Sequence, residues 1–180
     1  PRWRVSSRAR VLPVQLDFGT DNEELLKDPT YRGWRHPRLK GDAYFSLVDE
    51  FMQAFFRRYK SGLLQFEDFS SDKASILLEK YRDRYLCFND DIQGTGATVL
   101  AGVLGALRMV NRPPEALASL KVAVVGAGSA GIGVAQALRT AMVEAGARTA
   151  GDTANNFMVF DQNGLLGATR THCFLSVLVQ

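Results

Sequence analysis

Along the chain, short apolar runs alternate with longer stretches in which apolar residues recur every three or four positions. Runs of the first kind predict β-strands, and stretches of the second kind predict amphipathic helices. We expect strands at residues 11–16, 63–66, 85–88, 120–125 and 157–160. We expect helices at 43–60, 71–84, 93–110 and 132–145, with a loop region at 21–42. Strands that alternate with helices are typical of α/β proteins with a parallel sheet.

The predicted helix at 93–110 differs from the others because it is apolar on nearly every side. A helix of this kind is usually buried. We therefore expect close packing at its glycines, which are Gly94, Gly96, Gly102 and Gly105. We also expect a boundary between two domains near residue 90.

The composition is that of a globular protein, with 180 residues of which 46% are hydrophobic and 23% charged. It excludes a disordered tail, a collagen-like repeat and a disulfide-stabilised mini-protein. The net charge of +3 is too small to argue for nucleic-acid binding, and no apolar run approaches the roughly 20 residues that a membrane-spanning helix needs. The two cysteines, Cys87 and Cys173, favour reduced intracellular thiols over a disulfide framework.

The two ends of the chain lack the alternating pattern. The first residue is Pro1, and arginines crowd positions 2–10, while residues 173–180 form an apolar run with no turn signal after it. An organelle-targeting peptide would be Arg-rich like this start, but an internal piece of a longer protein is the simpler interpretation. We expect the chain to be a fragment.

A glycine-rich turn joins the predicted strand at 120–125 to the following helix, and Asp161 ends the next predicted strand. This context makes Gly-x-Gly-x-x-Gly a dinucleotide-binding signal, in which the glycines allow a tight turn and close approach of a pyrophosphate. The helix N-terminus would supply amide donors to the phosphates, and Asp161 would bind the ribose hydroxyls. The candidate cofactor-binding residues of the turn are Gly126, Gly128, Ser129, Ala130 and Gly131.

The residues near Asp161 bear on the choice of cofactor. Neither Gln162 nor Asn163 pairs with a 2′-phosphate as Lys or Arg would, which favours NAD, although a basic residue from another segment would permit NADP. Asp161 lies 30 positions beyond Gly131, where about 20 is usual. The polar stretch 148–156 accounts for the excess as a surface loop.

Two acidic pairs, Glu67–Asp68 and Asp90–Asp91, each follow a predicted strand, and a predicted helix separates them. A strand–helix–strand crossover makes the two strands parallel, so both pairs would emerge at the same edge of the sheet. Carboxylates gathered there repel one another unless a hard divalent cation such as Mg²⁺ or Mn²⁺ lies among them. By spacing alone, the alternative of solvated loop acids stays open.

Other polar residues give weaker signals. His36 and His172 lie in polar surroundings and are not expected to bind metal or to catalyse. The basic residues Arg32, Arg35, Arg38 and Lys40 have Tyr31 and Trp34 among them, a pattern that could suit nucleic acid. With the low net charge, a solvated loop is the favoured interpretation.

Several long strings of the sequence resemble the malic enzyme family, over about residues 11–166. They are LPVQLDFGTDN at 12–22, LLKDPTY at 25–31, DEFM at 49–52, QFEDF at 65–69, FNDDIQGT at 88–95 and GAGSAGIG at 126–133. The resemblance implies that residues 1–89 are part of a substrate and metal domain, with 1–10 atypical. It implies that residues 90–180 are the first half of a Rossmann-type NAD(P)-binding domain, with 168–180 atypical.

The resemblance also assigns roles to individual residues. Glu67, Asp68 and Asp91 would be the protein ligands of the divalent metal, Mg²⁺ or Mn²⁺. Asp90 would be the neighbouring acid that supports the catalytic lysine of the family, and Thr95 would begin the helix that flanks the nicotinamide. The implied reaction is the oxidative decarboxylation of malate to pyruvate and CO₂ with reduction of NAD(P)⁺.

The resemblance implies a homo-oligomer with malate and pyruvate as small-molecule partners, without nucleic acid or membrane, in the cytoplasm or in an organelle. The family's lysine base and tyrosine acid precede the segment with which this chain begins. We therefore expect the 180 residues alone to be inactive. The alternative is a non-catalytic, truncated product that binds nucleotide or metal.

Overall fold

The computed structural model describes residues 10–147, 149 and 151–167. The arginines before residue 10, His172, Cys173 and the terminal apolar run lie outside the described residues, so the predictions for them have no structural counterpart. The chain forms two compact units, Pro1–Lys60 and Ser61–Gln180, and each is described by itself.

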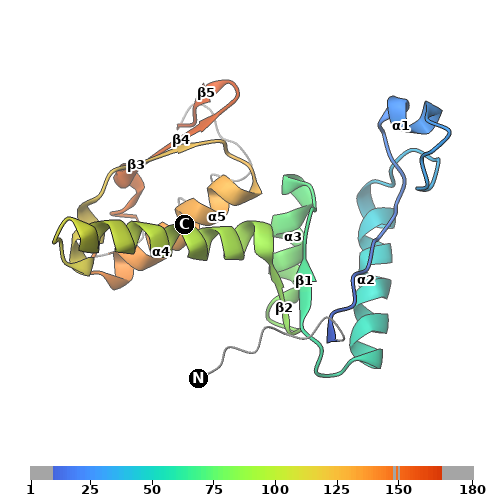
Figure 1. The fold of residues 1–180 in the computed structure, drawn as a ribbon, viewed down its shortest axis with the longest axis horizontal. Helices are drawn as coiled ribbons and strands as arrows, with labels where there is room; N and C mark the ends of the chain where they lie inside the picture. The colour runs from blue at the N-terminus through green and yellow to red at the C-terminus, as the bar shows by residue number, and fades with distance from the viewer. Residues whose placement is uncertain (1–9, 148, 150, 168–180) are drawn as a thin grey trace. The chain divides into compact units, whose positions relative to one another are not determined.

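The first unit contains helices α1, Glu23–Lys27, and α2, Gly41–Arg58 (Figure 1). The amphipathic helix predicted at 43–60 is present, and Tyr44, Val48 and Met52 are its buried residues. The ring of Phe18 packs edge-on against Tyr44 at a centroid distance of 4.9 Å, which joins the preceding loop to the helix. Two other apolar residues of the predicted range, Leu47 and Tyr59, are exposed.

The strand predicted at 11–16 is not formed, and Val11, Leu12 and Val14 are exposed. An apolar run becomes a strand only where another strand pairs with it. Here the chain that follows pairs with loop residues instead. The amide of Thr20 donates to the carbonyl of His36, and the amide of Leu39 donates to the carbonyl of Phe18.

Helix α1 lies in the region predicted to be a loop. Asn22 begins it, because its side-chain oxygen accepts hydrogen bonds from the amides of Glu24 and Leu25. An Asn cap with two acidic residues in the first turn is a helix-start signal. With five residues, α1 is too short to show the apolar periodicity on which the prediction relied.

The second unit begins with strand β1, Leu64–Phe66, helix α3, Ser71–Tyr81, and strand β2, Cys87–Asn89. The two strands pair in parallel, with Phe66 opposite Asn89, as the crossover argument predicts. The buried face of α3 is formed by Ala74, Leu77, Leu78 and Tyr81. Burial raises the pKa of the free Cys87 thiol in β2.

The single helix predicted at 93–110 is two elements. A π-helical turn, η2, spans Asp90–Gly94, and α4 then spans Thr95–Met109. The expectation that α4 is buried on all sides is wrong for this structure, since only Gly96 and Leu107 are buried along it. Gly102 and Gly105 face open space, so the close packing predicted for the glycines holds at Gly96 and not at these two.

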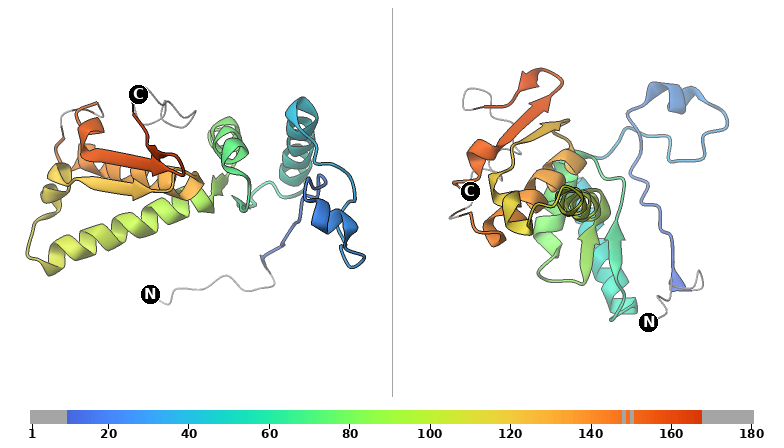
Figure 2. Two further views of the ribbon diagram at one scale, coloured as in Figure 1. Left: turned by 90° about the horizontal axis from the view of Figure 1, so that it is seen from above. Right: turned by 60° about the vertical axis from the view of Figure 1, so that its left-hand side comes forward.

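The remaining elements are η3, Pro114–Ser119, β3, Val122–Val125, α5, Ser129–Glu144, η4, Ala154–Asn156, β4, Phe157–Asp161, and β5, Gly164–Leu165. The sheet order is β3-β4-β5, with β3 and β4 parallel and β5 antiparallel to β4. Helix α5 runs beside α4, and its other side packs on the sheet (Figures 1 and 2).

Two apolar clusters hold α5 in place. Ile132 and Ala135 pack with Val124 and Val159 of the sheet, and Leu138 and Met142 pack with Leu107 of α4. The architecture is therefore α/β, with a strand–helix–strand unit followed by a Rossmann-like β3–α5–β4 unit. Among the described residues, no helix is long and apolar enough to cross a membrane.

Candidate metal and dinucleotide sites

The three acids predicted as metal ligands lie together at the carboxyl ends of β1 and β2. Glu67 and Asp68 directly follow β1, and Asp91 lies in the π-turn that follows β2. One potential ligand atom from each lies within 4.8 Å of the others. The backbone amide of Asp68 donates to Oδ2 of Asp91 at 3.0 Å, which ties the two segments together. Their assignment as metal ligands stays a prediction.

The turn at Asp68 is unusual because its φ is +59°. Left-handed backbone is uncommon for residues other than glycine, although Asp and Asn adopt it more readily than most. The chain bends at Asp68 after β1, and the amide of Asp68 donates to the carboxylate of Asp91. The side-chain Nε2 of Gln65 donates a hydrogen bond to Oε2 of Glu67 at 2.8 Å, which restrains the Glu67 carboxylate.

The chemistry of this donor set fits a hard divalent cation. Three carboxylates offer oxygen ligands only, as Mg²⁺ and Mn²⁺ prefer. Within the described part of the chain, none of the three forms a salt bridge, so no Lys or Arg relieves their mutual repulsion. A bound cation would relieve it.

Asp90 lies apart from the cluster, although it is adjacent to Asp91. Its carboxylate folds back over the π-turn to Gly94, where an added Cβ would overlap with Oδ1 of Asp90. The carbonyls of Asp90 and Ile92 accept from the amide of Thr95, the first residue of α4. The structure thus gives the two neighbouring acids different surroundings, and the predicted supporting role of Asp90 stays a prediction.

Asn89 shapes the π-turn and is a residue that the sequence analysis missed. It is 1% exposed, and its Oδ1 accepts from the amide of Ile92 at 3.0 Å. The side chain of Gln93 accepts in return from the amide of Asn89 at 3.0 Å. An Asn directly before an acidic pair is a cap signal that could have been read from the sequence. The Nδ2 of Asn89 is buried without a partner among the described residues.

The glycine-rich turn between β3 and α5 has the geometry expected of a dinucleotide-binding turn. Gly126 has a φ of +112°, and a Cβ added at Gly131 would overlap with the carbonyl oxygen of Gly126. Side chains at these two positions would therefore prevent the tight turn. The amide of Gly126 donates to the carbonyl of Phe160 at 2.8 Å, which places the end of β4 and Asp161 beside the turn.

Asp161 and the helix N-terminus therefore share one edge of the sheet. The first turn of α5 contains Ser129, Ala130 and Gly131, and Gly128 precedes it. The Oδ1 of Asp161 accepts from the amide of Asn163 at 2.7 Å, in the turn that leads into β5. A glycine turn, a helix N-terminus and a neighbouring acid form a cradle that fits a dinucleotide. Binding by these residues stays a prediction.

A second missed residue contacts the turn from another helix. Ser71, the first residue of α3, accepts a hydrogen bond through Oγ from the amide of Ser129 at 3.1 Å. Its partner lies 58 positions away, which no local sequence pattern reveals.

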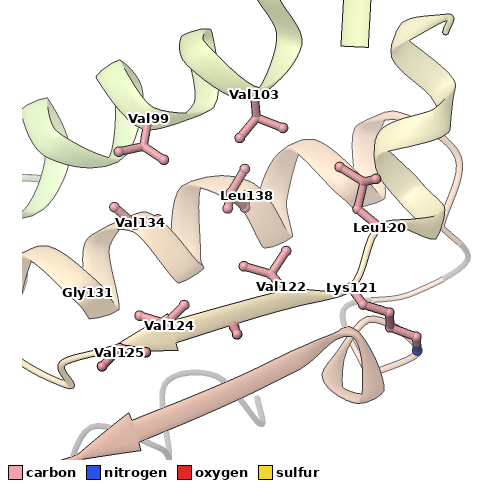
Figure 3. Close-up of a pocket in the computed structure, with 11 residues that line it drawn as sticks. Val99, Val103, Leu120, Lys121, Val122, Val124, Val125, Gly131, Val134 and Leu138 are labelled. Carbon is pink, nitrogen blue, oxygen red and sulfur yellow. The ribbon is translucent and has the colours of Figure 1, made fainter. Parts of the chain in front are cut away.

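A groove of about 470 Å³ lies between α4, α5 and β3, apart from the acidic cluster. Val99 and Val103 of α4, Val134 and Leu138 of α5, and Val122 and Val124 of β3 line it (Figure 3). Of the predicted site residues, Gly131 alone borders it. An apolar lining of this kind provides packing surface rather than chemistry.

The basic residues of the first unit bond mostly within their own loop. Arg35 donates to the carbonyls of Leu26, Asp28 and Tyr31, and Arg38 donates to the carbonyl of Gly19. Lys40 forms a salt bridge with Asp21 at 2.9 Å. These contacts favour the interpretation of a structured loop. His36 stacks on Trp34 at a centroid distance of 4.5 Å.

In comparisons with known proteins, one family model matches the N-terminal part of the chain and a second matches the C-terminal part. The family model of the malic enzyme N-terminal domain matches residues 6–82, and that of the malic enzyme NAD-binding domain matches residues 92–176. A mitochondrial NAD-dependent malic enzyme of Solanum tuberosum is 48% identical over 89% of this chain, and that of Shewanella denitrificans is also 48% identical over 89%.

The chain spans about a quarter of the length of these relatives, 26% and 28%. The crystal structure of Entamoeba histolytica malic enzyme superposes with a TM-score of 0.56 and 27% identity, covering 74% of this chain and 25% of that one. Two family models in chain order, relatives at this identity and a matching solved fold show that this chain belongs to the malic enzyme family.

Proposed function

We propose that this chain carries the metal-binding and NAD-binding segments of an enzyme that oxidatively decarboxylates malate to pyruvate and CO₂. One observation carries the proposal: the ligand atoms of Glu67, Asp68 and Asp91 converge within 4.8 Å in the same compact unit as the glycine turn. The names of the potato and Shewanella relatives, both NAD-dependent malic enzymes, support it.

Each candidate residue has a role in this proposal. Glu67, Asp68 and Asp91 hold Mg²⁺ or Mn²⁺, and the peptide amide of Asp68 orients the Asp91 carboxylate. A divalent ion held there would supply Lewis-acid chemistry at the C2 oxygen of malate, and a bound NAD⁺ would supply the hydride acceptor. Asp90, turned away from the cluster, is available to orient a proton-transferring lysine.

The dinucleotide is held by the turn between β3 and α5 and by the end of β4. Gly126, Gly128 and Gly131 let its pyrophosphate approach the backbone, and the first turn of α5, with Ser129 and Ala130, supplies amide donors. Asp161 binds the adenosine ribose, which favours NAD over NADP because a carboxylate repels a 2′-phosphate. Thr95 begins the helix on the nicotinamide side.

We place the division between the substrate and metal domain, 1–89, and the NAD-binding domain, 90–180, near residue 90. The matched ranges of the two family models, which end at 82 and begin at 92, support this division. The acidic cluster then draws ligands from both domains, with Glu67 and Asp68 on one side and Asp91 on the other.

Metal binding is tested on the 180-residue chain by titrating Mn²⁺ and following the free ion by electron paramagnetic resonance. We expect one site that is lost in Asp91→Asn. Asp83→Asn is the matched control, since Asp83 is 86% exposed and its ionic contact is the adjacent Arg82. Equal Mn²⁺ binding by both variants would contradict the proposed ligand set.

Activity is tested in a chimera in which this chain replaces the matching segment of the potato enzyme. We expect malate-dependent reduction of NAD⁺ with formation of pyruvate, faster than reduction of NADP⁺, and loss of turnover in Asp91→Asn. A folded chimera that binds Mn²⁺ and NAD⁺ without turnover would instead favour a non-catalytic binding protein.

A further inference from the structure

The residue before helix α5 has no side chain that could cap the N-terminus of the helix. The first amides of any helix lack an intrahelical acceptor and usually bond to the side chain of a Ser, Thr, Asp or Asn just before the helix. Here the residue before α5 is Gly128, which has no side chain, and no side-chain cap bond is formed from that position. The glycines that let a pyrophosphate approach therefore leave the helix N-terminus without a local cap.

The structure supplies the cap from another helix. Oγ of Ser71 accepts the hydrogen bond of the Ser129 amide at 3.1 Å, and it lies 3.5 Å from the position that a Cβ on Gly128 would take. The hydroxyl of Ser129 itself is buried and has no partner among the described residues. Ser71 is thus the side chain that fixes the first peptide of α5.

Ser71 also lies on the segment that carries two of the metal-binding candidates. Asp68 is three positions before it, and the amide of Asp68 is bonded to the carboxylate of Asp91. The short segment from Glu67 to Ser71 therefore contacts the acidic cluster at one end and the glycine turn at the other. Hydride transfer is sensitive to placement, since an error of about 1 Å costs on the order of a hundredfold in rate.

We propose that Ser71 is a positioning residue for the dinucleotide, an inference that rests on the proposed function. It acts through the Ser129 amide: by capping α5 from α3, it orients the remaining first-turn amides toward the pyrophosphate and fixes the glycine turn relative to the metal cluster. The other first-turn residues, Ala130 and Gly131, keep their amides available to the phosphates, and Ile132 already bonds to the carbonyl of Gly128.

The test uses three variants of the 180-residue chain. Ser71→Ala removes the hydroxyl, and Ser71→Thr retains it. Ser70→Ala is the control, because the neighbouring Ser70 is exposed and its Oγ contacts Lys73 rather than the turn. The readouts are hydrogen exchange at the Ser129 amide, calorimetric titration with NAD⁺ and titration with Mn²⁺.

We expect Ser71→Ala to speed exchange at Ser129 and to weaken NAD⁺ binding about three- to tenfold, the range of one neutral hydrogen bond. Mn²⁺ affinity should stay within about twofold, since β1, β2 and the Asp68–Asp91 bond hold the acids independently. Ser71→Thr and Ser70→Ala should resemble the unaltered chain. Rescue by Thr identifies the hydroxyl, rather than the packing of α3, as the cause.

Two results would overturn the inference alone. If Ser71→Ala binds NAD⁺ as tightly as the unaltered chain, or more tightly because the freed Ser129 amide reaches the phosphate, the cap does not position the site. If Ser71→Thr is as weak as Ser71→Ala, the hydroxyl is not the cause. Failure of the unaltered chain itself to bind NAD⁺ would instead contradict the proposed function, and the inference with it.

Discussion

Gly133 of α5 packs directly against the carbonyl group of Ile92 in the π-turn, so closely that an added Cβ would overlap with the Ile92 oxygen. Gly96 of α4 approaches the carbonyl of Gly133 in the same way. Three backbone segments therefore meet closely at this point, with the methyl group of Ala137 beside Gly96. Asp91 precedes Ile92, so the position of a candidate metal ligand depends on a glycine in the helix that follows the dinucleotide turn.

We predict that Gly133→Ala moves the π-turn and weakens Mn²⁺ binding by tenfold or more. Because the overlap is with backbone, which cannot rotate away, the substitution should also lower the free energy of unfolding by about 1–3 kcal/mol. The measurements are Mn²⁺ titration and urea denaturation. Unaltered Mn²⁺ affinity in a folded Gly133→Ala protein would mean that the turn does not depend on this contact.

Gly102→Ala is the matched control for that substitution. Gly102 lies inside α4 with nothing within 4 Å of an added Cβ. Replacing a helical glycine by alanine in open space should raise the free energy of unfolding by about 0.5–1 kcal/mol. The two substitutions should therefore shift stability in opposite directions, although both add one methyl group to a helix.

Asn89→Ala should disturb the π-turn from its other end. The substitution removes the hydrogen bond to the Ile92 amide and leaves that amide buried without an acceptor. A lost cap of this kind costs about 1–2 kcal/mol. We expect this loss of unfolding free energy in urea denaturation, together with weaker Mn²⁺ binding. Gln93→Ala removes an acceptor that is less buried, so it should lower the free energy of unfolding by less. Equal losses in the two variants would argue against Asn89 as the main determinant of the turn.

The sequence predicts those features of the site that depend on residues close together in the chain, and it does not predict contacts between residues far apart in the chain. The crossover argument placed the two acidic pairs at one edge of the sheet, and the family resemblance singled out Glu67, Asp68 and Asp91, which the structure brings together. The contacts Gly133–Ile92 and Ser71–Ser129 join segments far apart in sequence, and in each of them at least one partner is a backbone group. Backbone groups are the same in every residue, so no residue pattern marks the backbone partner of such a contact.

The same reasoning explains where the fold predictions failed. The helix α2 follows from apolar spacing, the parallel pairing of β1 with β2 follows from the strand–helix–strand crossover, and both predictions are confirmed. Residues 11–16 have a strand-like composition but no strand to pair with. Helix α4 has the composition of a buried helix, yet α5 covers only one of its faces, because composition reports a preference for burial and not the neighbour that provides it.

The acidic cluster should make the metal-free chain less stable than its neutralised variants. Glu67→Gln removes one of three negative charges that no salt bridge offsets within the described residues. We expect this variant to melt at a higher temperature than the unaltered chain without metal at low ionic strength, and the difference to shrink in 1 M salt because salt screens the repulsion.

Added Mn²⁺ should reverse that order. Binding to the folded state alone stabilises it by about 2.7 kcal/mol at a hundred times the dissociation constant. The unaltered chain should therefore gain melting temperature with Mn²⁺, while Glu67→Gln gains little. A metal-free chain less stable after Mn²⁺ addition, or an equal gain in both proteins, would contradict a metal site at these acids.

The first unit should lose stability in acid through Asp17. This carboxylate accepts from the amide of Trp34 at 2.6 Å and from the amide of Gly19 at 3.0 Å, and these bonds lower its pKa below 3.8. A carboxyl whose pKa is lower in the folded state stabilises the fold at pH values above 3.8, and that contribution is lost as the pH falls through the folded pKa.

Trp34 reports on this loop once Trp3→Phe has removed the other tryptophan of the chain. The readout is the urea midpoint of Trp34 fluorescence rather than its intensity, since the ring of His36 stacks on this indole and also affects its emission. We expect the midpoint to fall between about pH 5 and pH 2. Asp17→Asn should have a lower midpoint at pH 6 and a flatter decline, because Asp21 and Asp28, whose pKa values are also lowered, remain in both proteins. Parallel declines in the two proteins would show that Asp17 does not contribute to the acid sensitivity of the loop.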